Sequence, residues 1–83
     1  MSVEVAGNVI RIIGNAPVGD AEPILAALHE DPSRGIDLAQ AAHLHTAVIQ
    51  LLLALRPPIL GEPAYPLFVR HVVPLIDPGK GSA

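Results

Sequence analysis

Residues 36–55, IDLAQAAHLHTAVIQLLLAL, decide which fold this sequence can adopt. The stretch begins with residues 36–38, a short segment typical of a buried strand. It ends with residues 47–55, in which Gln50 is the only polar side chain. A helix that is apolar on nearly every side is buried on more than one, inside its own fold or against a partner. The stretch therefore predicts a strand and a buried helix, joined by the junction HLHT at residues 43–46.

The flanking sequence predicts strands and helices in alternation. Gly7 and Asn8 favour a turn between two strands, and Gly14 is expected to end the second of these strands. The spacing of apolar residues predicts helices before and after the opening stretch. The expected strands cover residues 3–5, 9–13, 36–38 and 59–60, and the expected helices cover residues 21–30, 47–55 and 67–73.

Capping residues and prolines give the expected ends of these helices. Asp20 is expected to cap the first helix, and Thr46 is expected to cap the second. Pro57 and Pro58 must stop the second helix, and Pro74 must kink or end the third.

Strands that alternate with helices predict an α/β fold, with a mixed β-sheet and helices packed on it. Residues 1–76 are expected to form a single domain. Residues 77–83 are polar and glycine-rich, and we expect them to be a disordered tail.

Composition excludes several classes of function. The net charge of −3 and only five Lys and Arg residues argue against nucleic-acid binding and against an anionic membrane surface. The chain has no Cys, so disulfides and thiolate zinc sites are excluded. Neither a signal peptide nor an apolar run long enough to span a bilayer is expected. These features predict a cytoplasmic protein without membrane insertion.

The junction does not favour metal binding or catalysis. His43 and His45 are two residues apart, but no Cys accompanies them and the carboxylates are scattered along the chain, which suits one shared metal poorly. Thr46 and His45 are sequence neighbours, and adjacent residues seldom aim at each other at a helix start. No nucleophile elbow or glycine-rich phosphate loop is present. We therefore expect no metal, no cofactor and no enzymatic activity.

The start of the helix after the junction is the remaining candidate site. A helix N-terminus carries partial positive charge and unpaired N–H groups, so this end could hold a phosphate or a partner's carboxylate. The alternative is that Thr46 only caps the helix.

Residues 37–49, DLAQAAHLHTAVI, resemble the signature of STAS domains, in which an Asp-Leu-Ser strand precedes a helix that starts apolar-Asp-Ser/Thr-Ser/Ala-Gly-Leu. The resemblance covers about residues 3–76. The matching positions are Asp37, Leu38, Leu44, Thr46, Ala47 and the apolar Ile49.

This resemblance implies a small α/β module that is generally not an enzyme. Many STAS domains are anti-sigma-factor antagonists, which dock onto a kinase-like partner that phosphorylates a serine at the helix start. Others belong to lipid-transport machinery, anion transporters or stress-sensing assemblies. The implied partner is thus a kinase-like anti-sigma factor, a chemotaxis component or a transporter component, in a bacterial signalling or transport-regulating assembly.

The chain departs from the family pattern at three positions. His45 stands where the family has Asp, Ala47 stands at the phosphorylated serine, and Val48 stands at the helical Gly. Ala47 cannot be phosphorylated, so the resemblance implies a binding module without the usual switch. The expected partner-binding residues are His45, Thr46, Ala47 and Gln50. An alternative is a structural protein that assembles as a homodimer or larger homo-oligomer, through residues 47–55 or the third helix.

Overall fold

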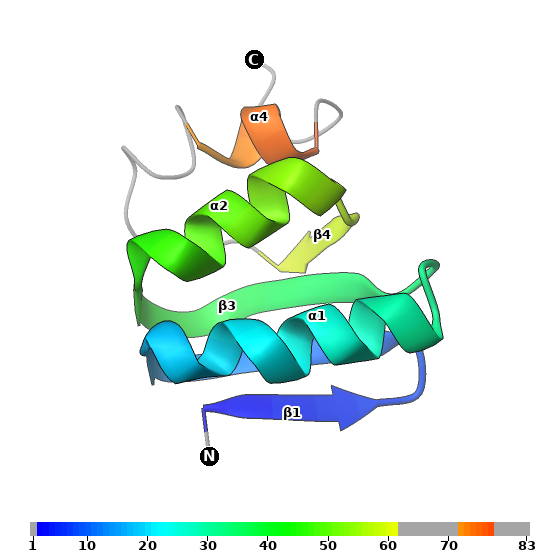
Figure 1. Ribbon diagram of the computed structural model, residues 1–83, viewed down its shortest axis with the longest axis horizontal. Helices are drawn as coiled ribbons and strands as arrows, with labels where there is room; N and C mark the ends of the chain where they lie inside the picture. The colour runs from blue at the N-terminus through cyan, green and yellow to red at the C-terminus, as the bar shows by residue number, and fades with distance from the viewer. Residues whose placement is uncertain (1, 62–71, 78–83) are drawn as a thin grey trace.

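The structure is a computed structural model that describes residues 2–61 and 72–77. Its described elements follow the expected order of strands and helices, so the predicted α/β class is confirmed (Figure 1). The elements are β1 (Val3–Ala6), β2 (Val9–Ala16), the 3-10 helix η1 (Val18–Asp20), α1 (Ala21–Glu30), β3 (Gly35–Leu44), α2 (Thr46–Leu55), β4 (Ile59–Gly61) and α4 (Val73–Ile76).

The four strands form one mixed sheet in the order β1-β2-β3-β4. β1 is antiparallel to β2, whereas β2, β3 and β4 run parallel to one another. α1 connects β2 to β3 and α2 connects β3 to β4. Figure 1 shows both helices on the same side of the sheet, as expected when successive strands are added in order through right-handed crossovers.

The core lies between this face of the sheet and the helices. α2 buries Val48 and Leu52, which are one turn apart, and its flanking residues Ile49, Leu51 and Leu53 also pack against the core. α2 contacts both α1 and α4, so the expectation that this helix is buried on more than one side is confirmed. The largest fully buried side chains are Ile10, Ile12, Ile24, Ile36, Leu38, Leu52, Ile59, Ile76, Val48 and Val73.

A row of charged side chains crosses the other face of the sheet. Arg11 of β2 is paired in register with Glu4 of β1 and with Asp37 of β3. Its guanidinium lies 3.6 Å from the Glu4 carboxylate and 3.5 Å from the Asp37 carboxylate. This face is therefore polar at its centre, in contrast to the helix-covered face.

The predicted end of β2 at Gly14 is wrong, because the strand continues to Ala16. Gly7 and Gly14 both have positive φ, of 58° and 68°. Gly7 lies in the turn between β1 and β2, as expected. Gly14 instead precedes a register shift between β2 and β3, where glycine can adopt the required backbone without strain.

β3 is also longer than predicted, because it extends through the first half of the junction to Leu44. Two register shifts let β3 keep pairing with β2, and they change which residues face the core. At the first shift the Asp37 carboxylate accepts a hydrogen bond from the Ala39 N–H at 2.9 Å. The buried apolar side chains of β3 are Ile36, Leu38, Ala41 and Leu44. Their spacing is not the strict alternation by which a strand is recognised in a sequence.

The beginning of α1 differs in detail from the prediction. Asp20 does occupy the N-cap position, but its side chain makes no capping hydrogen bond. Its carboxylate instead accepts a hydrogen bond from the Ser2 hydroxyl, which ties the first residues of the chain to the start of the helix.

The C-terminal part of the chain is described only over residues 72–77, so most of the helix predicted over residues 67–73 lies outside the described residues, as do residues 78–83. Pro74 lies in the first turn of α4, where a missing N–H group is tolerated. The Asp77 carboxylate accepts a hydrogen bond from the Ile59 N–H of β4 at 3.0 Å, so the predicted tail begins with a residue bound to the sheet.

Candidate functional site

His45 connects β3 to α2 and caps the helix. Its backbone is extended, with φ −60° and ψ 147°, and its N–H donates to the Ala16 carbonyl at 2.8 Å. Its Nδ1 accepts a hydrogen bond from the Ala47 N–H at 3.0 Å. The prediction that Thr46 caps α2 is therefore wrong, because Thr46 is already the first residue of the helix.

The cap has a simple chemical explanation. Nδ1 of a histidine is bonded to Cγ, as are the side-chain oxygens of Asp and Asn, so it can accept the same N–H two residues ahead. An acceptor at Nδ1 requires the neutral ring with its proton on Nε2. His45 thus performs the local structural role that the Asp of the family pattern would perform, without its negative charge.

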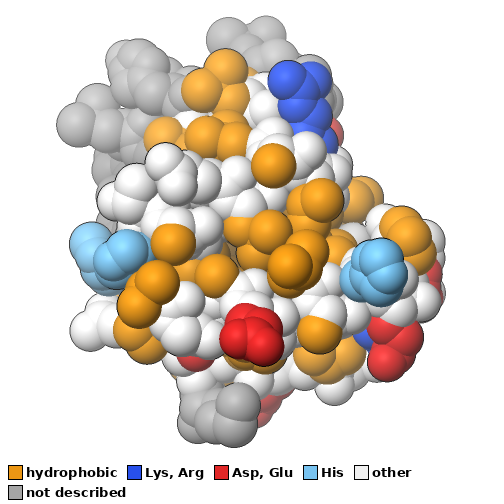
Figure 2. Space-filling view, viewed as in Figure 1, with side chains coloured by type: hydrophobic (Ala, Val, Ile, Leu, Met, Phe, Trp, Pro, Cys, Tyr) orange, Lys and Arg blue, Asp and Glu red, His pale blue; other side chains and the backbone are white. Residues whose placement is uncertain are grey.

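The first turns of α2 present polar side chains to solvent. Thr46 and Gln50 are both exposed, and their four-residue spacing places them on the same side of the helix. His45 is exposed beside them, and Figure 2 shows histidine side chains gathered at the start of α2. Ala47 is half-buried. The structure therefore brings three of the four predicted site residues onto one accessible surface, with Ala47 at its inner edge.

Three backbone donors at this helix start are already used. The Val48 and Ile49 N–H groups donate to the His45 carbonyl, at 2.9 and 3.1 Å, and the Ala47 N–H donates to the imidazole. A phosphate would have to displace these bonds. The surface formed by His45, Thr46 and Gln50 is consequently better suited to contacts through side chains than to anion capture by the backbone.

The histidines do not assemble a metal site within the described residues. His43 is paired with Asn15 next to a register shift, and both His43 and His45 are exposed. Among residues 2–61 and 72–77, no group of three or more His, Cys, Asp or Glu residues could hold a metal ion. The acceptor nitrogen of His45 is occupied by the helix cap.

The surface also lacks the arrangement needed for nucleophilic catalysis. Nδ1 of His45 bonds the Ala47 N–H, so that nitrogen is not a base for the Thr46 hydroxyl. The described part of the chain contains no buried polar or charged residue. The first turn of α2 contains no acidic residue, so the surface carries no fixed negative charge of its own.

A second feature, which the sequence analysis missed, lies at the opposite ends of the helices. An open pocket of about 340 Å³ separates the C-terminal end of α1 from that of α2, and we call it the helix-end pocket. Figure 2 shows hydrophobic side chains gathered between the two helices. The pocket is lined by Leu25, Leu28, His29, Pro32, Leu55, Arg56, Pro57 and Pro58.

A sequence signal for this pocket existed but was weak. Leu25 and Leu55 belong to the apolar stripes that predict helix burial, yet they remain 44% and 45% exposed. Nothing in a single sequence shows that the two residues lie at neighbouring helix ends, because that proximity depends on the parallel order of β2, β3 and β4.

Protein-family models, curated proteins and solved structures were all compared with this chain, and none matches it significantly. No helix among the described residues is long and apolar enough to cross a membrane.

Proposed function

We propose that this chain is a non-enzymatic, STAS-like module that binds another protein through the surface formed by His45, Thr46 and Gln50, with Ala47 at its edge. The observation that carries the proposal is the start of α2. There, polar side chains are exposed on a well-capped helix directly after β3, at the positions that match the partner-docking segment of the family pattern.

The order and pairing of the strands give further support. A β1–β2 hairpin is followed by two parallel crossovers that place the starts of α1 and α2 at one end of the sheet. This arrangement suits docking, because the start of α2 is held by hydrogen bonds to β2 and to its own cap. A rigid binding surface loses little conformational entropy when a partner binds.

The chemistry of the surface determines the kind of partner. His45 removes the negative charge that the family pattern has at this position, and α2 has no acid in its first turn. Such a surface fits an acidic patch on a partner protein better than a basic patch. A kinase-like anti-sigma factor, a chemotaxis protein or a transporter component in the cytoplasm would each fit this role. Ala47 cannot carry a phosphate, so binding would not be switched at that position.

Recovery of partners on immobilised protein tests this function. His45→Asp restores the acid of the family pattern and keeps a capping acceptor, whereas Thr46→Glu adds a carboxylate to the same surface. Ala26→Glu is the matched control, because it adds a carboxylate to the exposed side of α1. We expect both variants at the start of α2 to lose the partner that the wild type and Ala26→Glu recover. Equal recovery by all four proteins would exclude this surface as the contact.

Exposed apolar residues on α2 and α4 favour one second candidate, a structural homo-oligomer. Leu55 is 45% exposed and Leu75 is 59% exposed, on two helices that contact each other. Sedimentation at micromolar concentration separates the two functions. A stable dimer that Leu75→Asp dissociates supports self-association, and a monomer disfavours it.

A further inference from the structure

The helix-end pocket has the shape and the walls of a small-ligand site. Its volume of about 340 Å³ is at the lower end of the range of roughly 300–1,000 Å³ typical of ligand pockets. Leu25 and Leu28 of α1 form one wall, and Leu55 forms the facing wall at the end of α2. Two of these three leucines are nearly half exposed, so an apolar group that filled the pocket would remove their surface from water.

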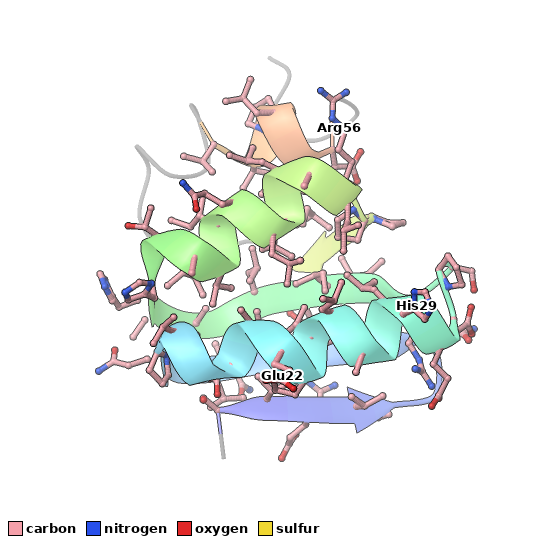
Figure 3. The ribbon with its side chains drawn as sticks, viewed as in Figure 1. Glu22, His29 and Arg56 are labelled. Atoms are coloured by element: carbon pink, nitrogen blue, oxygen red, sulfur yellow. The ribbon has the colours of Figure 1, made fainter. Side chains whose placement is uncertain are left out.

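Two residues with basic side chains also line the pocket. His29 is in the last turn of α1, and Arg56 follows α2 directly. Neither side chain forms a hydrogen bond or ion pair with another residue in the described ranges 2–61 and 72–77. Figure 3 shows His29 on α1 and Arg56 beyond the end of α2, with the Arg56 side chain extended away from α1. The pocket therefore has an imidazole on one side, and on the other side Arg56, whose guanidinium points away from α1.

The acidic residues next to His29 in the sequence already have partners. Glu30 accepts a hydrogen bond from Arg34 at 3.1 Å, and Asp31 accepts one from the Ser33 hydroxyl at 2.6 Å. Neither carboxylate lines the pocket. The ionisable groups that line it are thus both basic.

Helix ends carry partial negative charge, which would oppose an anion, but carbonyls at both of these ends are capped. The Ala27 carbonyl accepts from the Arg34 guanidinium at 2.9 Å and from the Asp31 N–H at 3.1 Å. The Leu52 carbonyl accepts from the Arg56 N–H at 2.8 Å. These donors offset part of the unfavourable field, and the full charge on Arg56 is comparable with the roughly half charges of the two helix ends taken together.

The backbone of Arg56 is also unusual. Its φ is 49°, and it is the only non-glycine residue with positive φ within the described part of the chain. Glycine is the residue that fits this position best at the end of a helix. At Arg56 a long cationic side chain instead occupies a strained backbone position beside the pocket.

We propose that the helix-end pocket binds a small amphipathic carboxylate with an unbranched apolar tail. The tail lies against Leu25, Leu28 and Leu55. The carboxylate accepts a hydrogen bond from the His29 imidazole and pairs with the Arg56 guanidinium, which reaches the pocket by rotation of its exposed side chain. This site lies at the opposite end of α2 from the surface formed by His45, Thr46 and Gln50, so it does not depend on the proposed protein-binding function.

Titration of the isotopically labelled full chain with decanoate, followed by amide NMR shifts, tests the proposal directly. We expect saturable shifts at the C-terminal ends of α1 and α2. Octanoate should bind about sixteenfold more weakly, because it lacks two methylenes and each buried methylene strengthens binding about fourfold. 1-Decanol and decyltrimethylammonium, which lack the carboxylate, should bind at least about tenfold more weakly than decanoate. All ligands are kept below the concentration at which they form micelles.

Variants separate recognition of the carboxylate from effects on folding. Arg56→Gly should weaken decanoate binding about tenfold while leaving the unfolding temperature unchanged or higher, because glycine relieves the positive φ. His29→Ala should also weaken binding, whereas His43→Ala, at an exposed histidine outside the pocket, should not. The proposal is overturned by equal binding of decanoate and 1-decanol, by tighter binding of the cation, by shifts located elsewhere, or by full affinity in Arg56→Gly.

Discussion

His45 holds the start of α2 against β2 through three of its groups. Its N–H bonds β2, its carbonyl begins the hydrogen bonding of α2, and its ring caps the same helix. The local geometry of the proposed binding surface therefore depends on this side chain more than on Thr46, which is exposed.

The capping role predicts which substitutions at the junction are costly. His45→Ala removes the acceptor for the Ala47 N–H and should lower the free energy of unfolding by about 1 kcal/mol. His45→Asp should retain most of the stability, because a carboxylate accepts the same bond. Thr46→Ala should change little. Urea unfolding of the three variants checks this, and an equal loss in His45→Ala and Thr46→Ala would contradict the assignment of the cap.

Asp31 gives a prediction about pH. Hydrogen bonds from the Ser33 hydroxyl and N–H lower the pKa of the Asp31 carboxyl below its ordinary value of 3.8, and Arg34 adds a smaller effect. A lowered pKa in the folded state means that this contribution to stability is complete above the ordinary value and is lost as the pH falls through the folded value. Asp31→Asn should therefore lose less stability than the wild type between pH 5 and pH 2, as measured by thermal unfolding. Equal losses of stability in Asp31→Asn and the wild type over this pH range would refute the prediction.

At the scale of elements, Arg34 fastens the end of α1 to the first hairpin. Its guanidinium donates to the Gly7 carbonyl at 2.9 Å, to the Ala27 carbonyl at 2.9 Å and to the Glu30 carboxylate at 3.1 Å. Only 13% of its side chain is exposed. The planar arrangement of guanidinium donors reaches all three acceptors at once, which an ammonium group does less well.

Loss of these three bonds should be clearly measurable. Arg34→Ala should lower the free energy of unfolding by about 2 kcal/mol, and Arg34→Lys should recover only part of that loss. Arg11→Ala is the matched control, because its ion pairs at 3.5 and 3.6 Å are long and partly solvated and should contribute less than about 1 kcal/mol. Chemical denaturation that gives similar losses for Arg11→Ala and Arg34→Ala would show that Arg34 does not have this role.

The sequence predicts where these elements occur better than where they end. Gly7, Pro57 and Pro58 act through backbone restrictions that hold in any context, so the first turn and the stop of α2 are predictable. The length of β3 is underestimated because the alternation of its buried residues changes phase at two register shifts. Those shifts depend on pairing with a strand that is distant in sequence, and no local pattern encodes them.

The candidate site, like the fold, could be predicted from the sequence only in part. The exposure of Thr46 and Gln50 follows from helical spacing once α2 is placed, so the polar surface could be predicted. The cap by His45 could not, because Thr is the more frequent capping residue and histidine reaches the N–H only from the extended backbone observed here. The helix-end pocket depends on how α1 and α2 pack side by side, which a single sequence does not show.

At the scale of the whole molecule, stability depends on α2, because a chain of 83 residues has a small core. Leu52 is fully buried, whereas Leu55 is 45% exposed on the same helix. Leu52→Ala should lower the free energy of unfolding by about 2–5 kcal/mol, and Leu55→Ala should lower it by much less. Denaturant titrations of the two variants provide the check, and similar losses would contradict the observed packing of α2.

The arrangement of the whole fold places two candidate surfaces at opposite ends of α2. The start of α2 carries the proposed protein-binding residues, and its end forms one wall of the helix-end pocket. Substitutions at one end should therefore leave binding at the other unchanged, since additivity holds for distant sites without shared partners.

The most direct test of the account is the affinity of the recovered partner for the wild type, Thr46→Glu and Ala26→Glu, measured by isothermal titration calorimetry on folded proteins. We predict that Thr46→Glu weakens binding by about tenfold or more, since it places a carboxylate against an acidic patch, while Ala26→Glu binds like the wild type. Equal affinities for all three proteins would contradict the claim that the start of α2 is the binding surface.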